Sequence, residues 1–240
     1  MTLSAKTESA LTLAVRNLSE RLKNKPELAL ADVAYTLNVG RRDYKHRAAI
    51  ACQDINDLSA VLDSNDTKRV VKELAPESEQ NIVFMFPGGG AQYSGMGAEL
   101  YEQEAVYRQS FDDCIACLPK AFGEKVKALV FAEKEQRDVA TVTLQTPTLT
   151  LTSLFATEYA LAKQLESWGA KPACMIGHSM GENTAACLAG VFSLYDAMNL
   201  VYIRGQVFEK APEGGMLSIS LPLEEAKKYM PDSLDVAAVN

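Results

Sequence analysis

Hydrophobic positions in the first third of the chain follow short helical and strand-like patterns. Apolar residues recur every three to four positions between Leu11 and Leu22, which predicts an amphipathic helix that ends before Pro26. Four further segments show shorter patterns, helical over 28–40 and 55–64, weakly alternating over 44–52, and strand-like over 68–74. A polar stretch, "APESEQ" at 75–80, follows them. We therefore expect a small α+β domain over residues 1–78.

From residue 79 onward, continuous apolar runs alternate with longer helical patterns. "NIVFMF" at 81–86 and "PACMI" at 172–176 are typical of buried strands, and the first ends abruptly in glycines. A long helix is predicted between them over 148–169. The remaining predicted elements are helices over 180–189, 194–211 and 223–230 and strands over 215–221 and 234–240. This alternation predicts an α/β domain over residues 79–240, with a parallel sheet covered by helices on both faces.

The composition is that of an ordinary globular protein. The 240 residues are 48% hydrophobic and 23% charged, with a net charge of −7. This acidity argues against a nucleic-acid surface, which requires clustered Lys and Arg. No apolar run approaches the ~20 residues of a membrane span, and the polar N-terminus lacks a signal-peptide core. We expect no contact with a membrane and place the chain in the cytoplasm.

The five cysteines lack the pattern of a secreted disulfide framework. Only Cys114 and Cys117 have a spacing that suggests a redox or zinc site. Phe111, Ile115 and Leu118 recur around them at helical spacing, and no second cysteine pair or nearby histidine completes a metal site. We expect these cysteines to pack in the core of the protein, and we expect no metal ion and no bound cofactor.

The clearest chemical signal is "GHSMG" at 177–181, between a predicted buried strand and an alanine-rich helix. In this context Gly-x-Ser-x-Gly forms a nucleophile elbow, a strained turn that presents Ser179 at the carboxyl end of the sheet. The close approach of strand and helix requires glycine at Gly177 and Gly181. The alternative is that Ser179 only caps the following helix, with Glu182 completing a capping box.

A glycine loop, "FPGGGAQYSGMG" at 86–97, leaves the first predicted strand of this domain. Beside the elbow, such a loop can bring a second backbone N–H to an oxyanion, next to the Met180 amide at the helix N-terminus. The alternative is a phosphate-binding loop. That interpretation lacks the Lys and the Ser or Thr of a P-loop and the spacing of a dinucleotide fingerprint.

Four motifs occur in one order along the chain: "FPGGGAQYSGMG", "LQTPTL", "GHSMGE" and "RGQVF". In this order and at these distances they resemble the acyltransferase domain of modular (type I) polyketide synthases, which is related to malonyl-CoA:acyl carrier protein transacylases. The residues before the polar connector, with "LADVAYTLNVGRRDYKHR", resemble the linker that joins ketosynthase to acyltransferase in those enzymes. The resemblance covers the whole chain. It implies an α/β-hydrolase-like core with a parallel sheet, and a ferredoxin-like small subdomain that is mostly absent from this sequence.

The resemblance assigns roles to five residues. It makes Ser179 the nucleophile that carries the acyl group as an ester, with the backbone amides of Gly89 and Met180 as the oxyanion hole. Gln145 matches a glutamine that lines the acyl site. Arg204 matches the arginine that pairs with the free carboxylate of malonyl-type extender units, a task that suits a planar guanidinium.

The sequence departs from the family pattern at three positions. Gly89 stands where the family usually has Gln, Ala91 where Ser is common, and Asn183 where Tyr is usual. The change at Gly89 leaves the implied hydrogen bond intact, because the backbone N–H donates it and not the side chain. The other two do not touch the implied chemistry.

A serine nucleophile needs a general base within hydrogen-bond reach, and only two histidines occur. Side chains of neighbouring residues diverge on an elbow, so His178 is expected to pack or to form hydrogen bonds rather than to activate Ser179. His46 lies among basic residues of the linker-like segment and is expected to be solvated. In the family the catalytic histidine lies beyond the position of Asn240. The chain is therefore expected to be a fragment that is inactive alone.

The implied function is transfer of a malonyl-type group from CoA to Ser179 and on to the phosphopantetheine thiol of an acyl carrier protein. Acyl-CoA is then a substrate, the phosphopantetheine belongs to the carrier protein, and the linker-like segment joins a ketosynthase. Arg204 favours a carboxylated extender unit, and Met180 favours malonyl over methylmalonyl. Two alternatives remain: a serine hydrolase of the α/β type, and a non-catalytic docking or scaffold fragment.

Overall fold

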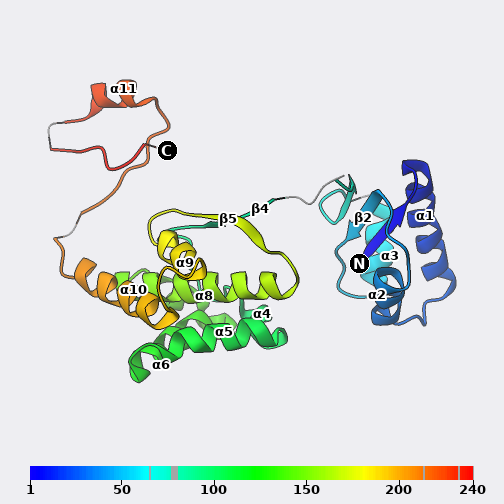
Figure 1. The fold of residues 1–240 in the computed structure, drawn as a ribbon, viewed down its shortest axis with the longest axis horizontal. Coiled ribbons are helices and arrows are strands. Elements are labelled where there is room, and N and C mark those ends of the chain that lie inside the picture. The colour runs from blue at the N-terminus through cyan, green and yellow to red at the C-terminus, as the bar shows by residue number, and fades with distance from the viewer. Residues whose placement is uncertain (65, 77–80, 213, 232, 240) are drawn as a thin grey trace. The chain divides into compact units, whose positions relative to one another are not determined.

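The structure, a computed structural model, describes residues 1–64, 66–76, 81–212, 214–231 and 233–239. The chain forms two compact units, Met1–Asn81 and Ile82–Asn240, whose elements are labelled in Figure 1. Most of the predicted polar connector, and the domain boundary expected near residue 78, lie outside the described residues.

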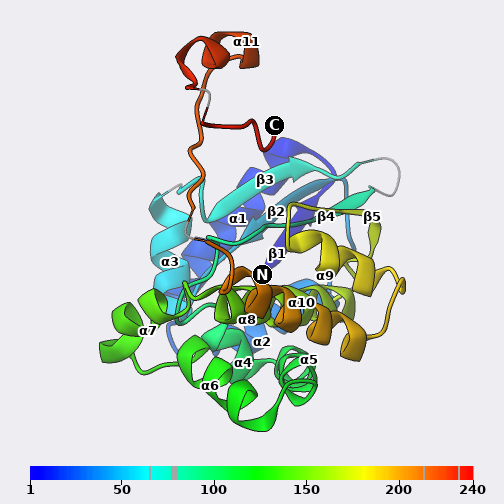
Figure 2. The same cartoon turned by 90° about the vertical axis from the view of Figure 1, so that its left-hand side faces the viewer.

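The first unit is a three-stranded antiparallel sheet with helices packed on it. Its strands lie in the order β1, β2, β3, side by side in Figure 2. Its elements are β1 (Thr2–Ala5), α1 (Glu8–Asn24), α2 (Leu30–Val39), β2 (His46–Ile50), α3 (Ile55–Ser64) and β3 (Val70–Leu74). The helix predicted between Leu11 and Leu22 is α1, which buries both residues in the core of the unit. This unit has the α+β character that the hydrophobic pattern predicts.

The strand β1 was not predicted from the sequence. Its four residues are too few, and too polar, to show an alternating pattern. Pairing with β2 creates the strand: Thr2 lies opposite Ala49, and the Ile50 amide donates to the Met1 carbonyl over 2.8 Å. The amino group of Met1 in turn donates to the Ile50 carbonyl over 3.1 Å.

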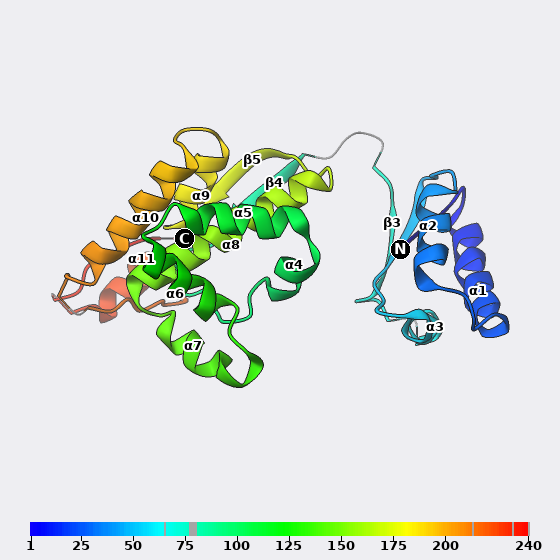
Figure 3. The ribbon, with the colours of Figure 1, turned by 90° about the horizontal axis from the view of Figure 1, so that it is seen from below.

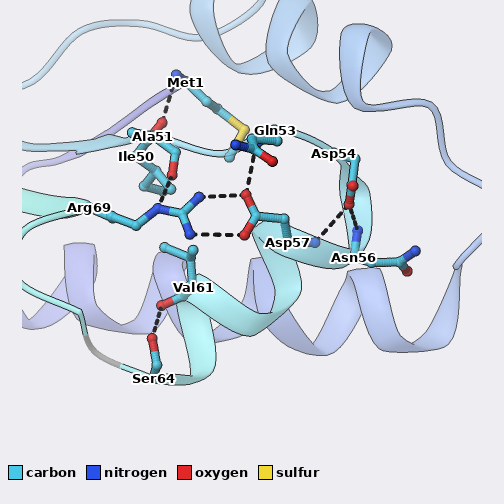
Figure 4. A network of polar contacts seen from close by, with 10 residues as sticks. All are labelled: Met1, Ile50, Ala51, Gln53, Asp54, Asn56, Asp57, Val61, Ser64 and Arg69. Atoms are coloured by element: carbon cyan, nitrogen blue, oxygen red, sulfur yellow. Dashed lines mark hydrogen bonds and ion pairs between the residues drawn. The ribbon is translucent and has the colours of Figure 1, made fainter. Parts of the chain in front are cut away.

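A polar network ties α3 to β3 within this unit (Figure 4). The Arg69 guanidinium meets the Asp57 carboxylate through both of its terminal nitrogens, with Nη1 2.9 Å from Oδ1. Nε of Arg69 donates to the Ala51 carbonyl, and Asp57 also accepts from the Gln53 amide over 2.7 Å. A bidentate, charge-assisted pair of this kind fixes the geometry of both partners.

We expect this network to make the first unit sensitive to acid. The hydrogen bond from Arg69 lowers the pKa of Asp57 from its ordinary 3.8 to about 2. Because the folded pKa lies below the unfolded one, the stabilisation is present above pH 3.8 and is lost as the pH falls towards 2. The protection of β2 and β3 against hydrogen exchange, corrected for the intrinsic exchange rate, should therefore fall over that range, and Asp57→Asn should abolish this acid-dependent part. Asp43→Asn, at an exposed ion pair with Arg47, is the control, and an acid response of β2 and β3 that survives in Asp57→Asn would contradict the assignment.

The second unit carries the longer helices and a parallel pair of strands. Its strands are β4 (Ile82–Phe86) and β5 (Pro172–Gly177). Its helices are α4 (Ala98–Gln103), α5 (Ala105–Ala116), α6 (Lys120–Val130), α7 (Arg137–Thr143), α8 (Pro147–Ser167), α9 (Gly181–Leu188), α10 (Leu194–Phe208) and α11 (Leu223–Ala226), with 3-10 turns at Lys134–Gln136 and Lys227–Tyr229. α8 runs along β4 and β5 in Figure 1, and α5 packs on its other side. Figure 3 shows α10 alongside α8 and α9.

The expectation of a sheet covered on both faces is wrong for the described residues. Phe84 and Phe86 of β4 pack against α8 through Ala162. The alternate residue Met85 is 76% exposed, and Ile176 of β5 is 55% exposed. Because successive side chains of a strand point to opposite faces, a continuous apolar run does not by itself show that both faces are covered.

The strands predicted over 215–221 and 234–240 are also absent from the described part of the chain, which is irregular there. Met216 is 93% exposed and Leu217 is 80% exposed. A strand requires a hydrogen-bonding neighbour, and no described residue pairs with either segment. The helix predicted over 223–230 is present as α11 and the 3-10 turn that follows it.

The core of the second unit lies among α5, α6, α8 and α10. Phe111, Cys114 and Phe155 are fully buried in it, so Cys114 has the packing role expected from the helical pattern. Burial raises the pKa of the Cys114 thiol well above its ordinary value, which makes it unreactive. No described helix is both long enough and apolar enough to cross a lipid bilayer.

Candidate active site

A strained turn joins β5 to α9 and carries Ser179. Its φ is +53°, and no other described residue except glycine has a positive φ. An L-residue pays a steric cost in this left-handed region, on the order of 1–3 kcal/mol, and such strain is concentrated at functional sites. The turn presents the Ser179 side chain to solvent, whereas the next residue, Met180, is fully buried.

Two glycines allow this turn because neighbouring backbone leaves no room for a side chain. A Cβ on Gly177 would lie 2.2 Å from the amide nitrogen of Glu182. A Cβ on Gly181 would lie 2.2 Å from the carbonyl oxygen of Phe86. The strand and the helix thus approach each other as closely as the sequence motif requires, and "GHSMG" forms a nucleophile elbow.

Helix capping does not account for Ser179. The N-cap of α9 is Met180, and no side chain caps that helix end. The Asn183 side chain instead donates to the Met180 carbonyl over 2.9 Å, which holds the first turn of α9 together. Asn183 therefore has a local structural role where the family pattern usually has Tyr.

The glycine loop lies directly against the elbow. A Cβ on Gly88 would be 3.0 Å from Nδ1 of His178 and 3.1 Å from Cβ of Ser179. Within the described residues, the backbone N–H groups of Gly89 and Met180 donate to no acceptor. Both amides are therefore available to an oxygen atom beside Ser179.

Two residues that the sequence motifs did not single out hold this loop in place. The Gln92 side chain accepts from the Gly90 amide over 2.8 Å and donates to the Thr150 hydroxyl over 3.3 Å. Thr150 in turn donates to the Leu144 carbonyl over 2.7 Å. A buried threonine in the first turn of a helix is an ordinary core position in the sequence. The role of Thr150 in holding the glycine loop follows only from its hydrogen bond with Gln92 in the folded chain.

The first turn of α8 also meets α10, at the residue next to Arg204. A Cβ on Gly205 would lie 2.3 Å from Cα of Thr148, so α10 crosses the start of α8 at the residue next to Arg204. Gln145 is exposed just before that helix begins. Arg204 is half-buried, and its guanidinium lies 5.7 Å from the centre of the Phe208 ring.

A carboxylate fixes the crossing of the two helices. Glu209, at the end of α10, accepts a hydrogen bond from the Thr148 amide over 3.0 Å. Hydrogen bonding by Thr148, from its side chain first and its amide second, lowers the pKa of Glu209, because it favours the charged form. Acidic groups also favour helix N-termini such as that of α8. Glu209 is thus a third residue, after Gln92 and Thr150, that the motifs did not reveal.

Among the described residues of the second unit, no hydrogen bond joins the His178 side chain to the Ser179 hydroxyl. His178 is exposed, and its amide donates to the Phe86 carbonyl over 2.9 Å. His46 is half-buried in β2 of the other unit, rather than fully solvated as expected. The described residues contain no cluster of His, Cys, Asp and Glu that could hold a metal ion.

Comparison with known proteins identifies the family of the chain. Residues 83–240 match the sequence model of the acyl transferase domain family, and residues 1–62 match that of the CurL-like C-terminal region of polyketide synthases. A phenolphthiocerol/phthiocerol polyketide synthase protein of Mycobacterium tuberculosis is 34% identical over 99% of this chain. The chain spans 16% of that synthase protein.

Solved structures show the same fold. The acyl transferase domain of ZmaA is 42% identical, with a TM-score of 0.85 over 95% of this chain and 52% of that one. The acyl transferase domain of SpnD is 35% identical, with a TM-score of 0.75 over 88% of this chain and 48% of that one. The chain thus spans about half the length of both solved domains. Sequence and fold agree that the chain belongs to the acyl transferase domain family of type I polyketide synthases.

Proposed function

We propose that this domain transfers a malonyl-type acyl group from CoA to Ser179 and then to the phosphopantetheine thiol of an acyl carrier protein. The observation that carries the proposal is Ser179 itself, exposed on a strained turn beside the unbonded amides of Gly89 and Met180. Such backbone strain is uncommon in a loop that only connects two elements, and it is concentrated at functional sites. The family of the chain supports the same reaction class.

In the first step, the Ser179 hydroxyl oxygen attacks the thioester carbonyl carbon while its proton passes to a general base. Negative charge develops on the carbonyl oxygen, where the amides of Gly89 and Met180 stabilise it by hydrogen bonding. The C–S bond then breaks, the general base returns its proton to the sulfur so that CoA leaves as the thiol, and Ser179 carries the acyl group as an ester. In the second step, the base takes the proton of the carrier-protein thiol, whose sulfur attacks the ester carbonyl carbon. The C–O bond to Ser179 then breaks, and the base returns the proton to the serine oxygen.

The general base remains a prediction from the family resemblance. The proposed base is a histidine other than His178, which is exposed on the elbow. A ketosynthase is the proposed neighbour of the first unit. The proposed location is the cytoplasm, where acyl-CoA is available and cysteines remain reduced. All five cysteines of the chain are free, which supports that location.

Arg204 and Gln145 are proposed to bind the acyl group. A guanidinium in this position can hold the free carboxylate of a malonyl group through two parallel hydrogen bonds. The SpnD domain, to which this chain is similar, is described in complex with a substituted malonyl group. No described carboxylate forms an ion pair with Arg204, so its charge is available to a ligand.

We expect Arg204→Ala to weaken the preference for carboxylated acyl groups. Hydrogen bonds to a charged group contribute on the order of 1.5–3 kcal/mol, so selectivity for malonyl-CoA over acetyl-CoA should fall about 10- to 100-fold. The measurement is the ratio of the two acylation rates at Ser179. Arg16→Ala, an exposed residue of α1, is the matched control. Unchanged selectivity in Arg204→Ala would refute the assigned role.

One experiment separates this function from the two alternatives. The chain, alone and within the longer synthase polypeptide proposed for it, is incubated with malonyl-CoA and a carrier protein, and the masses of both proteins are followed. A transferase gains one malonyl group at Ser179 and passes it to the carrier protein. A serine hydrolase releases free malonate and leaves the carrier protein unloaded. A docking fragment gains no acyl group in either form.

A further inference from the structure

A buried carboxyl group lies between α8 and the elbow helix α9. Glu158 of α8 is only 7% exposed. Its Oε2 accepts a hydrogen bond from the Thr184 hydroxyl of α9 over 2.6 Å. Its Oε1 is buried and has no partner among the described residues. The reaction proposed above assigns no role to this group.

The bond from Thr184 reaches the elbow within one helical turn. Thr184 is fully buried, and its hydroxyl oxygen lies 4.0 Å from the sulfur of Met180. Met180 is the N-cap of α9 and directly follows Ser179. Apart from this bond, no described side-chain hydrogen bond joins α8 to α9. The Glu158–Thr184 pair is therefore the polar connection between the long core helix and the strained turn.

The surroundings of Glu158 favour an uncharged carboxyl group. It borders an apolar cavity of about 390 Å³ next to β4, and no other described Asp, Glu, Lys, Arg or His lines that cavity. Tyr107 of α5 and Tyr93 of the glycine loop are the other titratable groups there. Burial raises the pKa of Tyr107 to about 12, so it stays neutral. On α9, Glu158 meets the uncharged Thr184, and the nearby Cys187 has its pKa raised to about 11 by burial.

We propose that Glu158 is a positioning residue of the elbow: its neutral carboxyl group, bonded to Thr184, fixes α9 and with it Met180 and Ser179, and ionisation of that group loosens the turn. Burial raises the pKa of Glu158 from 4.5 to about 8, against the smaller opposing effect of the Thr184 hydrogen bond. No described residue donates a hydrogen bond to Oε1, so a negative charge on the carboxylate would lack stabilisation there. The charged form therefore requires rearrangement or water entry.

The direction of the pH effect follows from this shift. Because the folded pKa is raised, the contribution of Glu158 to the free energy of unfolding is highest below pH 4.5. This contribution decreases as the pH rises towards 8, since the unfolded chain loses a proton that the folded chain keeps. The folded carboxyl group itself ionises near pH 8. Loosening of α9 is therefore expected at and above that pH.

The test follows α9 and Ser179 separately. Hydrogen-exchange protection of α9, corrected for the intrinsic exchange rate, is measured from about pH 6.5 to 9.5. Acylation of Ser179 by malonyl-CoA is measured over the same range, in the longest polypeptide that carries these residues. In the wild type, we expect protection to fall about tenfold across pH 8, and acylation to fall with it.

Three variants decide the assignment. Glu158→Leu should lower both protection and acylation at pH 7, and Glu158→Gln should restore part of the loss and remove the alkaline decline, because an amide accepts from Thr184 without ionising. Thr184→Val should weaken protection at all pH values. Glu124→Gln, at an exposed carboxylate of α6, is the control and should behave as the wild type.

Two results would overturn the proposal. One is constant protection of α9 in the wild type between about pH 7 and 9.5, a measurement that needs no variant to fold. The other is an alkaline decline of Glu158→Gln equal to that of the wild type. The acylation readout depends on the proposed function, whereas the exchange readout does not. If Ser179 is never acylated while protection still follows Glu158, the proposed function fails and the positioning role stands.

Discussion

Replacement of Ser179 by alanine abolishes covalent loading of the domain by malonyl-CoA. The acyl group is proposed to form an ester with this hydroxyl oxygen, and alanine has no atom that can replace it. Loss of a serine nucleophile typically lowers turnover on the order of 10⁴- to 10⁶-fold, so no acyl-protein should be detected by mass spectrometry. Alanine bears about the same strain as serine at a φ of +53°, and the melting temperature should stay almost unchanged.

Ser218→Ala is the matched control for this prediction. Ser218 is an exposed serine of an irregular segment in the same unit, and its loss should leave loading intact. Loading of the Ser179→Ala variant at the wild-type rate would show that another residue carries the acyl group. Wild-type protein that hydrolyses malonyl-CoA without loading a carrier protein would favour the serine hydrolase instead.

Gly181→Ala should both destabilise the second unit and inactivate it. The new Cβ would lie 2.2 Å from the Phe86 carbonyl oxygen and 2.6 Å from that of Pro87, and these are backbone atoms that cannot rotate away. Separating α9 from β4 costs about 3 kcal/mol, which lowers the melting temperature by roughly 6–12 °C. The shift also moves Ser179 relative to the Gly89 amide. A displacement of ~1 Å at a reacting group costs on the order of 100-fold in rate.

Gly214→Ala provides the control for this substitution. A Cβ on Gly214 meets no atom within 4 Å, so the change of residue type alone should have little effect. Calorimetry and the acylation rate check the two consequences separately. If Gly181→Ala retains wild-type stability and rate, the close contact of α9 with β4 does not define the elbow.

Local signals in the sequence were sufficient to place the main elements of both units. The helical spacing of Leu11 and Leu22 predicted α1, and the apolar runs predicted β4 and β5. The two segments predicted as strands near the end of the chain show where this reasoning fails. Apolar composition gives a segment the capacity to form a strand, but the hydrogen bonds of the strand belong to its neighbour.

The candidate site was predictable to a similar extent. Ser179 and its flanking glycines form a contiguous motif, so the sequence alone indicates the turn and its strain. The contacts among Gln92, Thr150 and Leu144 join residues far apart along the chain, and no spacing rule predicts them. The same holds for the bond between Glu158 and Thr184, which joins two helices.

The sequence by itself determined α1, the apolar runs that form β4 and β5, the glycines of the elbow and the family to which the chain belongs. These features depend on residue type at short spacing, where sterics and hydrophobic periodicity act locally. Only the tertiary structure decided that α8 supports both the glycine loop and α10 at its first turn, that one face of β4 and β5 is open in the described residues, and that a buried carboxyl group lies behind the elbow. The physical reason is that burial and hydrogen-bond partners are properties of two segments at once. They are therefore fixed only when the chain folds and brings those segments together.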